Sequence, residues 1–168
     1  MPAVYLTIWV AVALFTAAEL GRARSPRTTG WAWYASVLGL ALAVVHTLLA
    51  FDFVHGWSHD DAVLNTAMQT ERVFGMGVGW GVYVNYLFFL VWLMDLIWWR
   101  RDGRVDRRPR AATIALQAFY FVIVINAAVI FAIGWRRLAG LALVVLLLAA
   151  WRRHPRAISA DALADDRL

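Results

Sequence analysis

Residues 31–54 read Trp-Ala-Trp-Tyr-Ala-Ser-Val-Leu-Gly-Leu-Ala-Leu-Ala-Val-Val-His-Thr-Leu-Leu-Ala-Phe-Asp-Phe-Val, and this stretch decides the fold. It contains one histidine, His46, and one acid, Asp52, in a run of otherwise apolar, aromatic or small residues. About 20 apolar residues in a helix cross the hydrocarbon core of a bilayer. The stretch therefore predicts a transmembrane helix.

Four further apolar blocks accompany this one, and they predict an all-α membrane bundle of about five transmembrane helices. The chain is 62% hydrophobic with a mean hydropathy of +0.64, whereas soluble domains are about half apolar. The last block is short and spans only if the flanking arginines extend outward to the headgroups. We expect one bundle over residues 1–156 and a cytoplasmic tail over residues 157–168. The other four blocks are residues 3–20, 73–99, 111–135 and 138–151.

The arginines predict the orientation of the chain. Thirteen of the sixteen fall in the first loop, the third loop and the C-terminal region, and Arg72, Arg136 and Arg137 fall on the other side. Basic residues concentrate on the cytoplasmic side of membrane proteins. We therefore expect the N-terminus outside, the C-terminus in the cytoplasm, and a multi-pass protein of the bacterial cytoplasmic (inner) membrane.

The composition excludes several kinds of chemistry. The chain has no cysteine and no lysine, which excludes disulfides, thiolate catalysis, iron–sulfur clusters and a lysine Schiff base. The net charge of +5 is assigned to lipid headgroups, because arginines at helix ends meet anionic lipids. The lipid bilayer is thus an expected partner, and nucleic acid is not.

Tryptophans and capping residues refine the helix ends. Amphipathic indoles favour the membrane interface, so we expect an interfacial belt made of Trp31, Trp33, Trp98, Trp99, Trp135 and Trp151. Ser58 is a good N-cap, and Asp61 stands where the acid of a capping box would. A short interfacial helix is therefore expected over residues 62–72, in the loop between the second and third spans.

Polar side chains concentrate at the outer end of the second span. His46 lies roughly 10 Å inside the apolar layer, where an ionisable group normally has a partner. Imidazole and carboxylate groups bind copper, zinc and iron. The hypothesis is a transition-metal site made from His46, His55, His59, Asp52 and Glu71. The competing interpretation is a hydrogen-bonded core histidine and two solvated loop histidines.

The third block opens with glycines at positions 75, 77, 79 and 81. In a helix these make two GxxxG pairs on nearly opposite faces, which favour close packing with neighbouring helices, a homodimer or other membrane subunits. The alternative is that the glycines make room for haem b with His46 as axial ligand. Gly77, Gly81 and Asn85 would then line the cofactor.

Two acids near the cytoplasmic side need partners as well. We expect Asp95 to pair with Arg100 or Arg101, and Glu19 to pair with Arg22. Asn85 and Asn126 are expected to bridge helices by hydrogen bonds.

Three functional hypotheses follow from the sequence. The first is a metal or haem site in a membrane redox or metal-handling complex. The alternative is a non-catalytic accessory or scaffold subunit of a larger membrane complex, and the third is a small transporter. The sequence leaves open whether the protein is an enzyme.

Overall fold

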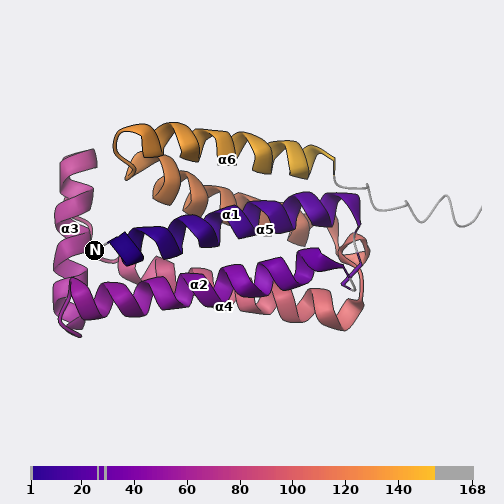
Figure 1. Ribbon diagram of the computed structural model, residues 1–168, viewed down its shortest axis with the longest axis horizontal. Coiled ribbons are helices and arrows are strands. Elements are labelled where there is room, and N and C mark those ends of the chain that lie inside the picture. The colour runs from indigo at the N-terminus through magenta and orange to yellow at the C-terminus, as the bar shows by residue number, and fades with distance from the viewer. Residues whose placement is uncertain (1, 26, 29, 154–168) are drawn as a thin grey trace, which may run out of the picture.

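The computed structural model describes residues 2–25, 27, 28 and 30–153. Within these residues the fold is all-α, with six α-helices, one short 3₁₀ helix and one π-helix. Five of the α-helices run lengthwise beside one another, and α3 lies across one end of the bundle (Figure 1). The predicted tail over residues 157–168 lies outside the described residues.

The helices follow the predicted apolar blocks, with shifted ends. The elements are α1 Pro2–Arg24, α2 Trp31–Phe53, α3 His59–Phe74, α4 Gly81–Asp102, the 3₁₀ helix η1 Val105–Arg107, α5 Arg110–Ile125, the π-helix η2 Asn126–Ile130 and α6 Trp135–Arg152. In the described part of the chain, four helices are long and apolar enough to cross a membrane: α1, α2, α4 and the continuous stretch Arg110–Ile130. The 18-residue α6 carries three arginines and is not among the four, so the fifth span stays a prediction.

The five long helices run alternately in opposite directions along the bundle, so each end of the bundle collects a different set of helix ends and loops. One end, here called the α3 end, holds the start of α1, the end of α2, the start of α4 and the turn between α5 and α6. The other, here called the arginine-rich end, holds the opposite ends of these helices. The first loop, the third loop and the end of α6 therefore lie at the same end, as the arginine distribution predicts. The structure contains no membrane, so the sidedness stays a prediction.

The bundle core is built from interlocking aromatic rings. Phe15 of α1 meets Trp92 of α4 and Tyr120 of α5 edge-on, at ring-centroid distances of 5.1 and 5.0 Å. The buried indole N–H of Trp92 donates a hydrogen bond of 2.9 Å to the Ser36 hydroxyl on α2. A buried indole needs such a partner, so this contact fixes α4 against α2.

The predicted third span begins later than expected, and this changes the meaning of the glycines. Residues 73–99 were expected to form one helix, but α3 ends at Phe74 and α4 begins at Gly81. Gly75 ends α3 with φ 72°, a left-handed conformation that glycine adopts at little cost. The segment between the two helices is a loop, so the predicted GxxxG helix faces are wrong, and the glycine-faced homodimer loses its structural basis.

The glycines instead let this loop lie on α3. A Cβ at Gly79 would meet the Val63 side chain at 2.6 Å and the Val63 carbonyl oxygen at 2.9 Å. Thr70 holds the loop from the α3 side, because its hydroxyl accepts a hydrogen bond of 2.7 Å from the Val78 N–H. Close approach in one helix–loop unit explains the glycine spacing better than packing between two long helices.

The short helix between the second and third spans is confirmed as α3, with its predicted cap. It begins at His59, directly after the predicted cap, and the Asp61 N–H donates a hydrogen bond of 3.2 Å to the Ser58 hydroxyl. Asp60 and Asp61 lie in the first turn, where negative charge complements the helix dipole. The helix lies across the end of the bundle, as an interfacial helix would.

Replacing Ser58 by alanine is expected to lower the free energy of unfolding by about 1 kcal/mol, because the Asp61 N–H loses its acceptor. Thermal unfolding of the detergent-solubilised protein measures the effect. Ser25→Ala, at an exposed position just after α1, is the matched control and is expected to change stability by less than about 0.5 kcal/mol. Equal stability of the two variants would contradict the capping role.

Candidate functional site

The polar residues near the α3 end of the bundle occupy three separate local settings. The His46 ring, half-buried on α2, has its Nδ1 2.7 Å from the Val4 carbonyl oxygen of α1. A carbonyl oxygen only accepts, so Nδ1 carries the proton and donates. The predicted need for a partner at this depth is thus met by a backbone carbonyl in the first turn of α1, whose oxygen has two lone pairs and can accept a side-chain donor in addition to its helical hydrogen bond.

His59 contacts tyrosines of α4 on both sides of its ring. Its Nε2 lies 3.1 Å from the Tyr83 hydroxyl, and its Nδ1 lies 3.4 Å from the Tyr86 hydroxyl. The rings of His59 and Tyr86 are stacked at 6.0 Å. These contacts attach the start of α3 to the start of α4.

The remaining predicted ligands are not drawn into one group. His55 packs edge-on against Phe51, and Asp52 accepts a hydrogen bond of 3.1 Å from the Trp57 indole N–H. Glu71 and Asn85 are exposed. Within the described residues, no three His, Cys, Asp or Glu side chains gather closely enough to hold a metal ion.

His46 therefore has an expected phenotype as a structural residue. His46→Leu removes the donor to the Val4 carbonyl, and we expect a loss of about 1 kcal/mol in the free energy of unfolding. Metal content by mass spectrometry and the visible absorption spectrum are expected to equal those of the wild type. His55→Leu serves as the matched control. Loss of a stoichiometric metal or of a Soret band in the His46 variant would contradict this assignment and restore the ligand hypothesis.

The most heavily buried polar group lies at the arginine-rich end of the bundle. It consists of Glu19 and Arg22 of α1, Asp95 of α4 and Arg108 of the loop before α5, here called the charge cluster. Their exposed fractions are only 3%, 4%, 2% and 5%. Charged side chains at such depth are rare in membrane helices and are expected to mark a site with a role.

Asp95 lies at the centre of the charge cluster. Two N–H groups of Arg22 donate to its Oδ2 at 3.0 Å each, and Arg108 donates to its Oδ1. Arg108 also donates to the Asp95 backbone carbonyl oxygen at 2.9 Å. Arg22 pairs in turn with Glu19 at 3.1 Å. The two guanidiniums and two carboxylates give a formal sum of zero, so the buried charge is balanced.

Tryptophans surround the charge cluster and shield it. The guanidinium carbon of Arg22 lies 4.2 Å from the ring centroid of Trp99, and that of Arg108 lies 4.8 Å from the ring centroid of Trp98. The Trp151 indole N–H on α6 donates a hydrogen bond of 2.8 Å to the carboxylate of Glu19. Cation–π contacts strengthen in a desolvated setting, so the indoles stabilise arginines that have left water.

The predicted pairings are therefore partly corrected. The Glu19–Arg22 pair is confirmed, but Asp95 pairs with Arg22 and Arg108. Residues five or six positions apart on a helix do not share a face, which separates Asp95 from Arg100 and Arg101. Both latter residues are exposed, and Arg100 lies over the Trp33 ring at 5.5 Å.

Two other expectations about polar and aromatic residues are also corrected. Trp99 was expected in the interfacial belt but is 0% exposed. Asn126 does not bridge to another helix through its amide N–H, which donates to the Val122 carbonyl oxygen one turn back at 2.6 Å. Trp31 and Trp135, at 59% and 75% exposed, remain available to the interface as predicted.

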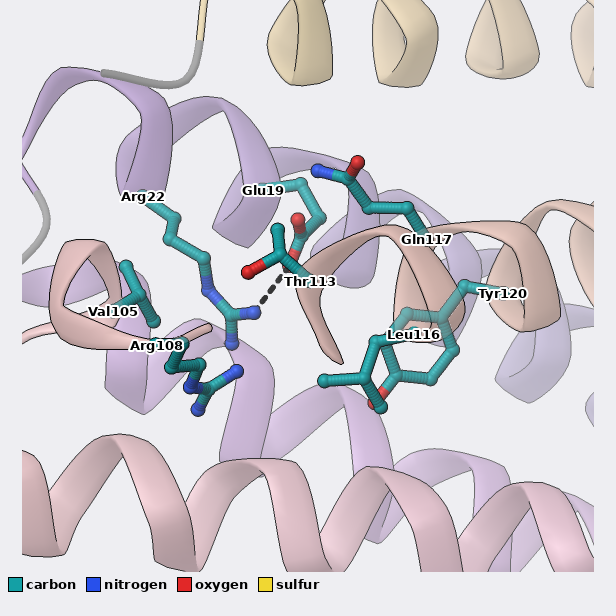
Figure 2. A pocket seen from close by; sticks show the side chains of 8 residues that line it. All are labelled: Glu19, Arg22, Val105, Arg108, Thr113, Leu116, Gln117 and Tyr120. Atoms are coloured by element: carbon teal, nitrogen blue, oxygen red, sulfur yellow. Dashed lines mark ion pairs between the residues drawn. The ribbon is translucent and has the colours of Figure 1, made fainter. Parts of the chain in front are cut away.

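A small pocket adjoins the charge cluster (Figure 2). Its volume of about 10 Å³ is the room that a single water-sized particle needs. The lining residues are Glu19, Arg22, Val105, Arg108, Thr113, Leu116, Gln117 and Tyr120. They come from α1, the α4–α5 loop and α5, so the pocket exists only where these three segments meet.

The fold and this site define a multi-span helical membrane protein with a buried charge cluster at one end of its bundle. Comparison of the chain with protein-family models, curated proteins and solved structures gives no match.

Proposed function

We propose that the protein is a non-catalytic scaffold subunit of a larger membrane complex. The observation that supports this is the charge cluster, which connects three long helices and a loop through balanced contacts. Arg22 joins α1 to α4, Arg108 joins the α4–α5 loop to α4, and the Glu19–Trp151 hydrogen bond joins α1 to α6. A network of this kind holds helix ends in a fixed relation, which a scaffold requires.

The outer surface of the bundle suits this proposal. Large apolar side chains are exposed on every long helix, among them Leu6, Leu38, Leu90, Val122 and Val145. Such surfaces meet lipid tails or the helices of a neighbouring subunit, and van der Waals packing drives helix association in lipid. The metal or haem hypothesis draws no comparable support, because no described group of three ligands gathers around His46, His55 or His59.

Isolation from the native membrane tests the proposal. The tagged full chain, extracted in mild detergent, is analysed by native mass spectrometry. We expect the 18.9 kDa chain to appear with a different polypeptide in a fixed ratio that survives dilution. Asp95→Asn is expected to reduce recovery of that assembly, and Asp102→Asn is the matched control. A lone monomer that retains its fold in several detergents and in nanodiscs would overturn the scaffold role.

A further inference from the structure

The pocket beside the charge cluster is lined by more hydrogen-bond donors than its neighbours satisfy. Within the described residues, Arg22 Nε, Arg108 Nε and the Tyr120 hydroxyl are buried and have no hydrogen-bond partner. All three side chains line the same pocket. Buried polar groups nearly always have partners, so three such groups around one small volume indicate a missing acceptor.

The nearest carboxylates are already engaged. One Glu19 oxygen pairs with Arg22 and the other accepts the Trp151 N–H, and both Asp95 oxygens receive arginine N–H groups. A bound water would accept these hydrogen bonds and would give its own two protons to acceptors such as the Thr113 hydroxyl and the Gln117 amide oxygen, which also line the pocket. A monatomic anion only accepts, which matches the three available donors.

Size and charge limit the anion further. A pocket of about 10 Å³ has room for one particle close to the size of water. A monatomic halide, which is slightly larger than water, is therefore at the upper limit, and a phosphate or sulfate does not fit. The charge cluster sums to zero, and exposed arginines at the same end add positive potential. These are Arg24, Arg27, Arg100, Arg101, Arg110, Arg152 and Arg153.

We propose that this pocket binds one halide-sized monovalent anion, held by Arg22, Arg108 and Tyr120. The site goes beyond the scaffold role and does not depend on it. Tyr120 is the most useful residue to alter, because it takes no part in the ion pairs. Its ring packs on Phe15 and Phe88, and phenylalanine keeps that packing while removing the hydroxyl.

The test uses the purified full chain in nanodiscs. Melting temperature is followed during titration with sodium chloride, sodium bromide, sodium gluconate and sodium sulfate at constant ionic strength. We expect chloride and bromide to raise the melting temperature saturably, and gluconate and sulfate to have no saturable effect. Tyr120→Phe is expected to weaken chloride about tenfold, as loss of one hydrogen bond to a charged group predicts. Tyr34→Phe, at a 62% exposed position at the same end, is expected to bind as the wild type does.

Two results would overturn the site. If melting temperature follows ionic strength alone, the pocket holds water only. If Tyr120→Phe and Tyr34→Phe bind chloride equally well, the anion is bound by the exposed arginines instead. Chloride NMR line broadening on the wild-type protein, with competition by bromide, measures binding without any variant and decides the matter if Tyr120→Phe fails to fold. Absence of broadening that bromide reverses would also reject the proposal.

Discussion

Replacing Asp95 by asparagine is expected to lower the free energy of unfolding by about 3–5 kcal/mol, the usual effect of removing one partner from a buried ion pair. Asp95 accepts from two arginines that are each at most 5% exposed. Asparagine keeps the size and one oxygen but removes the negative charge. The two guanidiniums would then share only Glu19, and one buried positive charge would be unbalanced.

Steric trapping or denaturant unfolding in mixed micelles measures this loss. Asp102→Asn lies near the end of the same helix at a partly exposed position, and we expect it to change stability by less than about 0.5 kcal/mol. A change below about 1 kcal/mol for Asp95→Asn would show that water reaches the charge cluster and that its burial does not matter.

A double-mutant cycle separates the pair from the rest of the charge cluster. Arg108→Gln alone leaves Asp95 with Arg22, and the double variant removes both members of the Asp95–Arg108 pair. We expect the double variant to lose about 0.5–3 kcal/mol less than the sum of the two single losses, as residues in one network do. Additive losses would mean that Arg108 stabilises the loop without acting through Asp95.

Helical spacing is sufficient to predict most of the charge cluster. Phe15, Ala18, Glu19 and Arg22 repeat at intervals of three and four, and all are buried on α1. Trp92, Asp95, Leu96 and Trp99 repeat in the same way on α4. A charged residue on an otherwise apolar stripe faces the bundle, so these two faces predict that Glu19, Arg22 and Asp95 meet. Arg108 could not be predicted in this way, because it lies in a loop whose path depends on the packed helices.

The apolar blocks and the cap could be predicted because they depend on local sequence. Bilayer thickness sets the length of a transmembrane helix, and the Ser58 hydroxyl accepts a hydrogen bond from an N–H of the helix that it begins. Neither feature depends on tertiary contacts, so both can be predicted from the sequence. The glycine segment could not be read in the same way. A run with glycine at every second position fits a helix with grooves or a loop, and only the left-handed Gly75 and the contact of Gly79 with Val63 distinguish them.

Gly140 is the position where an added methyl group is expected to do the most damage. A Cβ there would overlap the Ala128 carbonyl oxygen, which belongs to the π-helix η2. That backbone is constrained on both sides, because the Phe131 N–H donates to the Asn126 carbonyl oxygen at 3.0 Å and Arg137 donates to the Val129 carbonyl oxygen at 3.1 Å. A π-helix leaves its carbonyls spaced differently from an α-helix, and Gly140 lets α6 lie directly against them.

We therefore expect Gly140→Ala to lower the free energy of unfolding by about 2–3 kcal/mol, in the upper part of the range for overpacking. Alanine favours a helix over glycine by about 1 kcal/mol. A loss of stability in Gly140→Ala would therefore come from the steric overlap and not from helix propensity. Gly39→Ala, where a Cβ would lie 3.1 Å from the Trp92 ring, is expected to lose less, because a ring at this distance needs to move only slightly. Gly30→Ala meets nothing within 4 Å and is expected to lose at most about 1 kcal/mol, the effect of alanine at the N-cap of α2. Equal stability of the three variants, measured by steric trapping, would show that α6 moves freely against η2 and that the close approach of these two helices does not stabilise the bundle.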